Sequence, residues 1–320
     1  MQLRSDHVEV SVPATSANLG PGFDALGLAV NLRDTIRVRA LATPSVQVDV
    51  EGEGADGVPT DERHLVARAI RVGLEYVGAP NVGLHLTCRN VIPHARGLGS
   101  SAAACVGGLL AARGLISDSG ALDDDAILAL ATQMEGHPDN AAPAILGGAT
   151  VAWMGQDPDG SPVARATRFT LADDIDPIVL IPDTTLATKA ARAALPAEVP
   201  HRDASFNAGR SALLVAALSQ HPEFLLDATA DRLHQGFRGA QMPSSTLLVE
   251  RLRSAGLAAV ISGAGPTVLV LGTRSGRAEE DEAIAGITGR WDEDGTAPGG
   301  WRVLRPGVAH EGASCRVVGA

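Results

Sequence analysis

The stretch with the clearest chemical meaning is rich in glycine and serine and runs from Pro93 to Ala103, PHARGLGSSAA. It leads into Ser101–Arg113, which is small and apolar on every side, as expected of a buried helix. Glycines let backbone N–H groups turn inward toward a ligand, and a helix N-terminus adds partial positive charge and unpaired donors. The stretch therefore predicts a cradle for a triphosphate, with the hydroxyls of Ser100 and Ser101 free to bind phosphate oxygens or Mg²⁺. The alternative is an ordinary tight turn in which Ser100 caps the helix.

Two further loops are rich in glycine and polar residues. The first, PATSANLGPGFD at 13–24, follows an alternating segment, and rigid polar loops are where small-molecule sites are usually built. The alternative for this loop is a structural turn capped by Asp24. The second, SGAGPT at 262–267, joins two apolar segments and predicts a hairpin turn whose glycines allow the backbone to lie against a ligand.

The charged residues exclude several classes of protein. The chain holds a single lysine, Lys189, and its other 25 basic residues are arginine. A Walker-type phosphate loop and a protein-kinase domain each need a lysine in a fixed motif, so both are excluded. With 26 basic against 37 acidic residues the net charge is −11, which argues against a nucleic-acid-binding surface.

The hydrophobic pattern predicts the elements that must position these loops. Alternating or apolar runs predict strands at His7–Val12, Ile36–Ala40, Val46–Val50, Gly83–Thr87, Val163–Phe169, Pro177–Ile181, Ala258–Ser262 and Thr267–Leu271. Helical spacing predicts helices at Asp61–Val77, Ser101–Arg113, Asp123–Met134, Ala204–Gln220, Pro222–Leu233 and Ser244–Ala255, with Asp61 as the N-cap of the first. Strands and helices mix without a strict βαβ order, which favours an α+β fold.

A length of 320 residues predicts two domains. The stretch 156–162 is rich in turn residues, and we predict a boundary shortly after it, giving domains 1–165 and 166–320. Cys88, Cys105 and Cys315 are too widely spaced for a disulfide framework or a zinc site, and we expect buried apolar thiols. The N-terminal residues have no apolar signal region, and the longest apolar run is far shorter than the roughly 20 residues that cross a bilayer. We therefore expect no membrane association and a cytoplasmic location.

Taken together and in this order, the three loops closely resemble the GHMP kinase superfamily, in which Pro-x-x-x-Gly-Leu-Gly-Ser-Ser-Ala-Ala is the ATP-phosphate loop. Within it, the loop at 13–24 is similar to that of the homoserine kinases. GHPDNAAP at 136–143, followed by two glycines at 147–148, resembles that family's GHxDNVAP…GG stretch. The departures are Ala141 in place of valine and the residues at 94–96, which the family leaves variable. The resemblance spans 13–267, nearly the whole chain.

The resemblance implies a GHMP fold, with an N-terminal mixed α/β ATP-binding domain and a C-terminal ferredoxin-like α+β domain. It implies transfer of the γ-phosphoryl group of ATP to the hydroxyl of L-homoserine in threonine biosynthesis. The ATP-binding residues that it implies are Pro93, His94, Ala95, Arg96, Gly97, Leu98, Gly99, Ser100, Ser101, Ala102 and Ala103. Mg²⁺ would be bound by Ser101 and Glu135. Related enzymes are often homodimers, whereas the sequence itself does not decide the oligomeric state.

The substrate of such a reaction is a zwitterion with a hydroxyl group. Its carboxylate needs arginine, whose planar fork binds carboxylates bidentately, and the resemblance points to Arg192 and Arg238. It assigns the ammonium to Asp24 or Asp139 and the hydroxyl to Asn18, His137 and Asn140. Two mechanisms stay open. Either Asp139 is a general base, or Asn140 and Arg238 stabilise the transferring group without a base, and we favour the second.

Three other functions are consistent with parts of the sequence. The nearest is another GHMP small-molecule kinase, of the mevalonate or sugar type, against which the loop at 13–24 argues. Lys189 would also allow a Schiff base with pyridoxal phosphate. A non-catalytic, ligand-binding regulator is disfavoured because all three motifs, Glu135 and both serines are intact.

Overall fold

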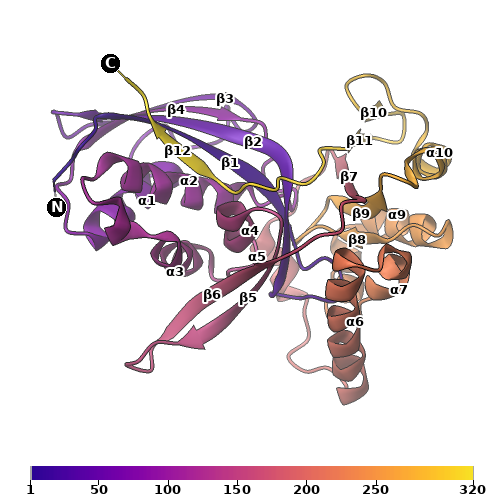
Figure 1. Cartoon of the computed structure of the whole chain (residues 1–320). Coiled ribbons are helices and arrows are strands. Elements are labelled where there is room, and N and C mark those ends of the chain that lie inside the picture. Colours follow the sequence, from indigo (N-terminus) through magenta and orange to yellow (C-terminus); the bar gives the residue numbers. More distant parts are fainter. Residues whose placement is uncertain (1, 320) are drawn as a thin grey trace.

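The computed structural model describes residues 2–319, and Figure 1 shows two sheets side by side, each packed against helices. The strands of the first sheet are β1 (His7–Ala17), β2 (Leu26–Leu41), β3 (Val46–Gly52), β4 (Gly83–Asn90), β5 (Ala149–Gln156), β6 (Pro162–Phe169) and β12 (Ser314–Val317). Those of the second are β7 (Ile175–Pro182), β8 (Ala259–Ile261), β9 (Val268–Thr273), β10 (Thr296–Ala297) and β11 (Trp301–Leu304). The α+β class predicted from the sequence is confirmed.

In the first sheet the strand order is β12-β1-β2-β4-β3, and β2 also pairs with β5, which continues to β6. The helices on this side are α1 (Leu65–Tyr76), α2 (Ser100–Leu115), α3 (Asp124–Glu135) and α4 (Ala141–Leu146), with a 3₁₀ turn η1 at Ser119–Leu122. The buried residues of α1 recur at helical spacing, as in Val66, Ile70 and Leu74, because only one of its faces meets the core. Helix α2 packs on α1, α3 and β1, which explains why its sequence is apolar on every side.

The second sheet has the order β10-β11-β7-β9-β8, with antiparallel pairs throughout the part of the chain that is described. Its helices are α5 (Thr188–Ala193), α6 (His201–Ser219), α7 (Leu225–Ala228), α8 (Gln235–Arg238), α9 (Pro243–Ser254) and α10 (Arg277–Thr288), with 3₁₀ turns η2 (Pro222–Phe224) and η3 (Gly239–Gln241). Strand β7 is buried along its whole length, and Ile178, Leu180, Val268 and Val270 form the centre of this smaller core with Leu252 of α9.

Two local predictions are wrong. Helix α1 begins at Leu65, and its N-cap is His64, whose ring nitrogen accepts from the N–H of Val66. The carboxylate of Asp61 instead binds the backbone and guanidinium of Arg63 in the preceding turn. The single helix predicted at Pro222–Leu233 is also absent.

In place of that helix, α7 ends at Ala228, the chain turns, and the short helix α8 begins at Gln235. Asp231 accepts from the N–H groups of Leu233, His234 and Gln235, and this side chain opens the short helix α8. In a continuous helix these N–H groups would donate to backbone carbonyls four residues earlier and not to the carboxylate of Asp231.

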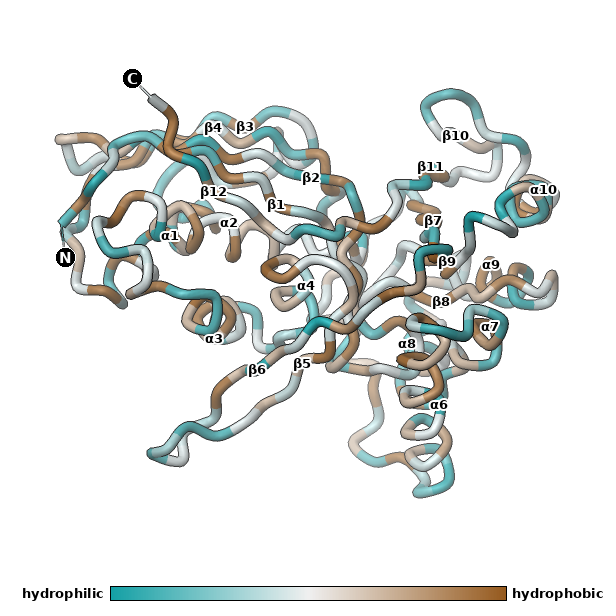
Figure 2. Tube along the Cα trace, viewed as in Figure 1, coloured by the Kyte–Doolittle hydropathy of each residue, from teal (hydrophilic) through white to brown (hydrophobic). Residues whose placement is uncertain are grey.

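The predicted division near residue 165 falls inside β6, which pairs with β5 along its whole length. At the other end of the chain, β12 returns to the first sheet and pairs with β1. We propose that the first domain ends between β6 and β7 and takes up the chain again at β12. The β5–β6 hairpin projects from the body of the molecule, and Figure 2 shows that its tip is hydrophilic. Within residues 2–319, every helix is too short or too polar to span a lipid bilayer.

Candidate active site

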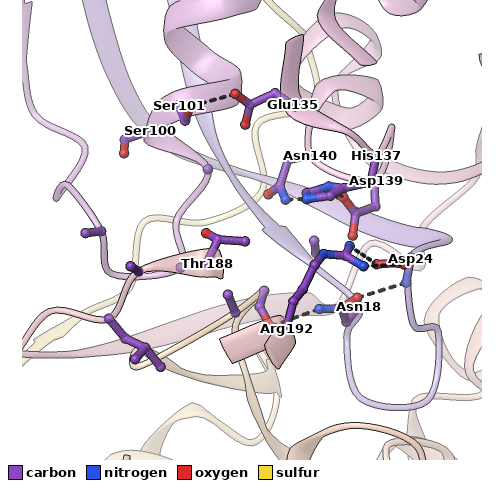
Figure 3. Close-up of a pocket in the computed structure, with 18 of the residues that line it drawn as sticks. Asn18, Asp24, Ser100, Ser101, Glu135, His137, Asp139, Asn140, Thr188 and Arg192 are labelled. Carbon is purple, nitrogen blue, oxygen red and sulfur yellow. Dashed lines mark hydrogen bonds and ion pairs between the residues drawn. The ribbon is translucent and has the colours of Figure 1, made fainter. Parts of the chain in front are cut away.

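A cleft of about 370 Å³ lies where the two sheets meet, and most of the predicted site residues line it (Figure 3). These are Asn18, Asp24, Ala95, Gly97, Gly99, Ser100, Ser101, Glu135, His137, Asp139, Asn140, Arg192 and Arg238. Figure 3 shows Ser101 and Glu135 at one end, Asp24 and Arg192 at the other, and Asn140 between them. Segments far apart in the sequence therefore form one site with two differently built ends.

The predicted phosphate loop passes along the cleft with its backbone in the left-handed region. Ala95, Gly97 and Gly99 have φ values of 53°, 74° and 69°. A Cβ atom on Gly97 would lie 2.2 Å from the carbonyl oxygen of Ser262, so this position excludes a side chain. Gly99 is the N-cap of α2 and Ser100 is its first residue, so the alternative that Ser100 caps the helix is wrong. The start of α2 thus faces the cleft without a capping side chain from its N-cap residue.

The hairpin between β8 and β9 holds this loop in place. The hydroxyl of Ser262 donates to the carbonyl of Gly97 at 2.6 Å, and the N–H of Gly263 donates to the carbonyl of Ala17 at 3.0 Å. The N–H of Thr15 donates to the carbonyl of Leu98 at 3.1 Å. All three glycine-containing loops are therefore joined by hydrogen bonds, and the hairpin backbone lines the cleft as the sequence suggested.

Not every residue of the predicted ATP stretch reaches the cleft. Pro93, Leu98, Ala102 and Ala103 are buried beneath it. The side chain of Arg96 turns away and donates to the carbonyls of Pro182 and Asp183 at 2.9 and 3.0 Å. Arg96 thus ties the loop to the end of β7, and the assignment of the whole stretch to ATP binding stays a prediction.

A second, more apolar cavity of about 250 Å³ lies beside the start of α2. Ser100 and Ser101 line both cavities, so the two adjoin at the phosphate loop. Its apolar lining residues are Ile36, Val58, Pro59, Leu65, Val66 and Ala104. His94, which the sequence assigned to ATP binding, lies here and not in the first cleft.

The predicted metal-binding pair forms a direct contact. The hydroxyl of Ser101, on α2, donates to Glu135 Oε1, at the end of α3, at 2.6 Å. One turn further along α2, the Sγ atom of Cys105 lies 3.6 Å from the same oxygen, and burial, with Glu135 beside it, raises the pKa of this thiol. Cys88 and Cys105 are buried, as predicted, whereas Cys315 is only partly buried.

The chemistry of this pair fits a magnesium ion. Hydroxyl and carboxylate oxygens are the hard ligands that Mg²⁺ takes, and the ion usually needs only one or two carboxylates besides phosphate and water. Within residues 2–319 there is no group of three or more histidine, cysteine, aspartate or glutamate side chains placed to hold a metal. A site here would therefore depend on phosphate oxygens.

The middle of the cleft holds His137, Asp139 and Asn140. His137 Nδ1 lies 2.7 Å from Asp139 Oδ1, and this hydrogen bond raises the pKa of His137 above its ordinary value. Asp139 is only 2% exposed. The hydroxyl of Thr15 donates to Asn140 Oδ1 at 2.9 Å, which fixes the amide and leaves its NH₂ group 3.4 Å from Asp139 Oδ1.

At the far end, Arg192 and Asp24 form a bidentate ion pair. Arg192 Nη2 lies 2.6 Å from Asp24 Oδ1, and Nη1 lies 3.1 Å from Oδ2. Asn18 holds Asp24 by accepting from its N–H at 2.9 Å, and donates to the carbonyl of Gly263 at the same distance. The two side chains predicted to bind the opposite charges of a zwitterion thus neutralise each other.

Arg238 lies deeper than Arg192 and is 2% exposed. Its Nη1 donates to the carbonyl of Gly263 at 3.2 Å, and its guanidinium lies 5.4 Å from the centre of the Phe23 ring. Burial and the nearby charge of Arg192 lower its pKa, but an arginine stays protonated. Arg238 thus adds a second guanidinium to this end of the cleft, beside the ion pair of Arg192 and Asp24.

The sequence did not single out several residues that line or support the cleft. Thr15, which fixes Asn140, lies in the first polar loop, and Ala264 lies in the hairpin, so the motif contained them without indicating their roles. Leu186, Ala187 and Thr188 enter the cleft from the segment before Arg192. Their residue types carry no chemical signal, and only the tertiary fold places them there.

Comparison with protein families gives two matches. Residues 64–148 match the GHMP kinases N terminal domain, and residues 213–289 match the GHMP kinases C terminal domain. The chain is 51% identical to the homoserine kinase of Streptomyces avermitilis, over 97% of this chain and 96% of the relative. It is 50% identical to the homoserine kinase of Clavibacter michiganensis, over 97% and 94%.

Solved structures agree with this relationship. The crystal structure of homoserine kinase from Cytophaga hutchinsonii matches with a TM-score of 0.78 and 25% identity, covering 99% of both chains. The mevalonate kinase of L. major matches with a TM-score of 0.65 at 14% identity, covering 95% of this chain and 98% of that one, and shows the shared fold alone. The protein therefore belongs to the GHMP kinases and, within them, to the homoserine kinase family.

Proposed function

We propose that this protein transfers the γ-phosphoryl group of ATP to the side-chain hydroxyl of L-homoserine, a step toward threonine. The observation that carries this proposal is the pairing of two different ends in one cleft. A helix N-terminus with Ser101 and Glu135 at one end suits a metal-bound triphosphate. An aspartate and an arginine at the other end suit the ammonium and the carboxylate of an amino acid. The homoserine kinases at about half identity support the same substrate.

ATP would lie along the start of α2, with its triphosphate against the loop that contains Gly97 and Gly99. The adjoining apolar cavity, beyond Ser100, has the position and character expected of a nucleobase site. Ser101 and Glu135 would hold Mg²⁺, which neutralises charge on the phosphates when bound. These placements rest on the donor chemistry and on the order of the cavities.

The amino acid would bind at the other end, where its two charged groups would replace the contact between Asp24 and Arg192. Its carboxylate takes the place of Asp24 beside Arg192, with Arg238 behind it, while its ammonium takes the place of Arg192 beside Asp24. A zwitterion makes this exchange without leaving either side chain unpaired, whereas a ligand with a single charge strands one of them. The hydroxyl then extends toward Asn140 and His137, on the side of the phosphate loop, whereas Asn18 stays beside Asp24 at the amino-acid end.

Phosphoryl transfer needs little covalent help from the protein, because the transition state is stabilised mainly by alignment and by neutralised charge. The NH₂ group of Asn140 and the guanidinium of Arg238 are the fixed donors available beside the reacting oxygens. Asp139 is engaged by His137, which supports the mechanism without a general base.

Replacement of Asp139 with asparagine tests this mechanism. We expect measurable turnover of L-homoserine, with kcat reduced by less than about 100-fold, because an amide still accepts the hydrogen bond from His137. A general base is worth about 10²–10⁴-fold in rate. A loss of kcat by about four orders of magnitude at unchanged KM would instead make Asp139 the base.

The amino-acid end is tested by replacing Arg192 with methionine. We expect KM for L-homoserine to rise about ten- to hundredfold, the usual effect of losing a hydrogen bond to a charged group, while KM for ATP stays the same. Lys189 lies on the same helix, is exposed and does not line the cleft, so its replacement with methionine is the matched control. Equal effects of the two substitutions would remove Arg192 from the substrate site.

The substrate itself is tested by ADP release from ATP with L-homoserine, L-serine, L-threonine and mevalonate in parallel. We expect L-homoserine to give the highest kcat/KM. Turnover of mevalonate or a sugar without turnover of L-homoserine would favour another GHMP small-molecule kinase. Dimer formation and a cytoplasmic location stay predictions from the sequence.

A further inference from the structure

His234 is a completely buried histidine that lies behind the cleft and does not line it. Its Nε2 lies 2.7 Å from the carbonyl oxygen of Gly20, in the polar loop that ends at Asp24. Its Nδ1 lies 3.2 Å from Nη1 of Arg238. The ring also stacks on Phe23, with 5.1 Å between the ring centres. One imidazole therefore touches both the loop of the first domain and the deep arginine of the second.

The two neighbours of the ring fix its tautomer. A carbonyl oxygen only accepts, so Nε2 must carry a hydrogen and donate to Gly20. A guanidinium only donates, so Nδ1 must be unprotonated and accept from Arg238. The hydrogen bonds of His234 are thus satisfied only by the neutral Nε2–H form. Protonation at Nδ1 would place its N–H against the N–H of Arg238, and a positive ring against a positive guanidinium.

Arg238 depends on this acceptor. Its Nη1 is held by Nδ1 of His234 and by the carbonyl of Gly263, while its Nε has no hydrogen-bond partner in the described chain. Few groups therefore fix the angle at which the guanidinium meets the cleft. We propose that His234 is a positioning residue for the transfer reaction, which orients Arg238 through Nδ1 and joins it to the Gly20 loop through Nε2. This inference rests on the proposed function only for its kinetic test.

The charged groups that face His234 come from three directions. Asp231, at 3.7 Å from Nε2, favours the protonated ring, and so does the more distant Asp24, whereas Arg238 opposes it. The carboxylate of Asp231 already accepts from three backbone N–H groups and from Asn207, which satisfies much of its charge locally. Burial dominates and lowers the pKa of His234 below its ordinary value. The neutral ring therefore persists at neutral pH and is lost only in acid.

Two substitutions separate the two ring nitrogens. In His234→Asn the amide oxygen lies near the position of Nδ1 and keeps an acceptor for Arg238, but the donor to Gly20 is lost. In His234→Gln the amide nitrogen reaches the position of Nε2 and keeps that donor, but the acceptor is lost. Both variants are assayed well below their measured Tm values, so that loss of folding does not enter the comparison.

For His234→Gln we expect kcat/KM for L-homoserine to fall at least about tenfold, as for the loss of a hydrogen bond to a charged group, with KM for ATP unchanged. His234→Asn should stay within about threefold of the wild type, because the acceptor for Arg238 is kept and only the neutral hydrogen bond to Gly20 is lost. If the glutamine variant is as active as the asparagine variant, or if both lose activity equally, the acceptor role of Nδ1 is refuted.

The dependence on pH provides a second readout. At saturating Mg·ATP, KM for L-homoserine in the wild type should stay constant near neutral pH and rise only in acid, because the lowered pKa of His234 delays its protonation to a pH below the ordinary histidine value of about 6.5. The hydrogen bond to Asp139 shifts the pKa of His137 the other way, so that residue does not produce this acidic change. The rise should be absent in His234→Asn, and an identical rise in that variant would contradict the proposal.

A third measurement needs no substrate. Nitrogen-15 NMR of the histidine rings at neutral pH should show a ring with Nε2 protonated and Nδ1 bare that disappears in His234→Gln, while the similar signal expected of His64, whose Nδ1 accepts from Val66, stays. If the signal that His234→Gln removes has Nδ1 protonated, the inference is overturned. Because this spectrum does not involve L-homoserine, failure of the substrate assay and failure of the positioning role are distinguished.

Discussion

Replacement of Glu135 with glutamine should lower kcat with L-homoserine by about 10³-fold, and raise the Mg²⁺ concentration needed for half-maximal rate. The amide has nearly the same shape, so the loop and the two helices keep their packing, but its negative charge is gone. Metal stabilisation of phosphoryl charge is worth several kcal/mol, and about 1.4 kcal/mol corresponds to each factor of ten in rate. Kinetics over a range of Mg²⁺ concentrations measure both effects.

The matched control for this substitution is Gln133, an exposed residue two positions earlier on α3. Gln133→Ala should leave both kcat and the Mg²⁺ dependence unchanged. If Glu135→Gln keeps kcat within about fivefold of the wild type, a change of only about 1 kcal/mol, Glu135 does not bind the metal and the hydrogen bond with Ser101 is structural.

The second large effect is expected at Arg238. Its replacement with methionine should reduce kcat/KM for L-homoserine by about 10³-fold, the lower end of the effect known for arginines that stabilise phosphoryl transfer. In the proposed reaction the side chain would combine two roles, because it would face the substrate carboxylate and its buried positive charge would lie beside the reacting group. Steady-state kinetics on the purified variant give the loss, and binding of ATP, measured by calorimetry, should be unaffected.

Arg232 serves as the control because it lies in the same segment but is half exposed, with its guanidinium 3.9 Å from the ring centre of Phe206 on the outside of the domain. Arg232→Met should keep kcat/KM within about twofold, as expected of surface charge that contributes little. Equal losses in the two variants would mean that Arg238 acts through the stability of the domain and not in the reaction.

The sequence indicated most of the residues that line the cleft, but fewer of the details of the fold. Asn18, Asp24, Glu135 and Arg192 lie in loops or at helix ends, and their local motifs were sufficient to identify them. Such motifs persist because the chemistry requires given residue types at given spacings. The orientation of Arg96 could not be predicted in this way, because the carbonyls that it binds come from β7.

The supporting residues were harder to find for the same reason. His234 carries no motif, and its role appears only when Gly20 and Arg238 are brought to opposite sides of its ring. Thr15 is likewise recognisable only through its contact with Asn140. Sequence patterns indicate the residues that meet a ligand, whereas residues that hold other residues depend on contacts between distant segments.

In the fold, many of the periodic segments were predicted, whereas β5, α10 and the short strands β10, β11 and β12 were not. Strands β10, β11 and β12 have between two and four residues, too few for alternation to emerge from the background. The helix predicted at Pro222–Leu233 failed because the apolar spacing there continues past Thr229, while the carboxylate of Asp231 starts a new helix. The contacts of Asp231 thus mark a break that the periodicity does not reveal.

The return of β12 to the first sheet sets an order for folding during synthesis. Val8 and Ser11 pair with Val317 and Ser314, so this edge of β1 lacks its β12 partner until residues 314–317 leave the ribosome. The second domain, which lies between, can finish folding first, because domains generally fold as units as the chain is made. An open strand edge invites pairing with other chains. The last strand therefore acts as a closing segment, and a nascent chain stalled before residue 314 would be the form most prone to aggregate.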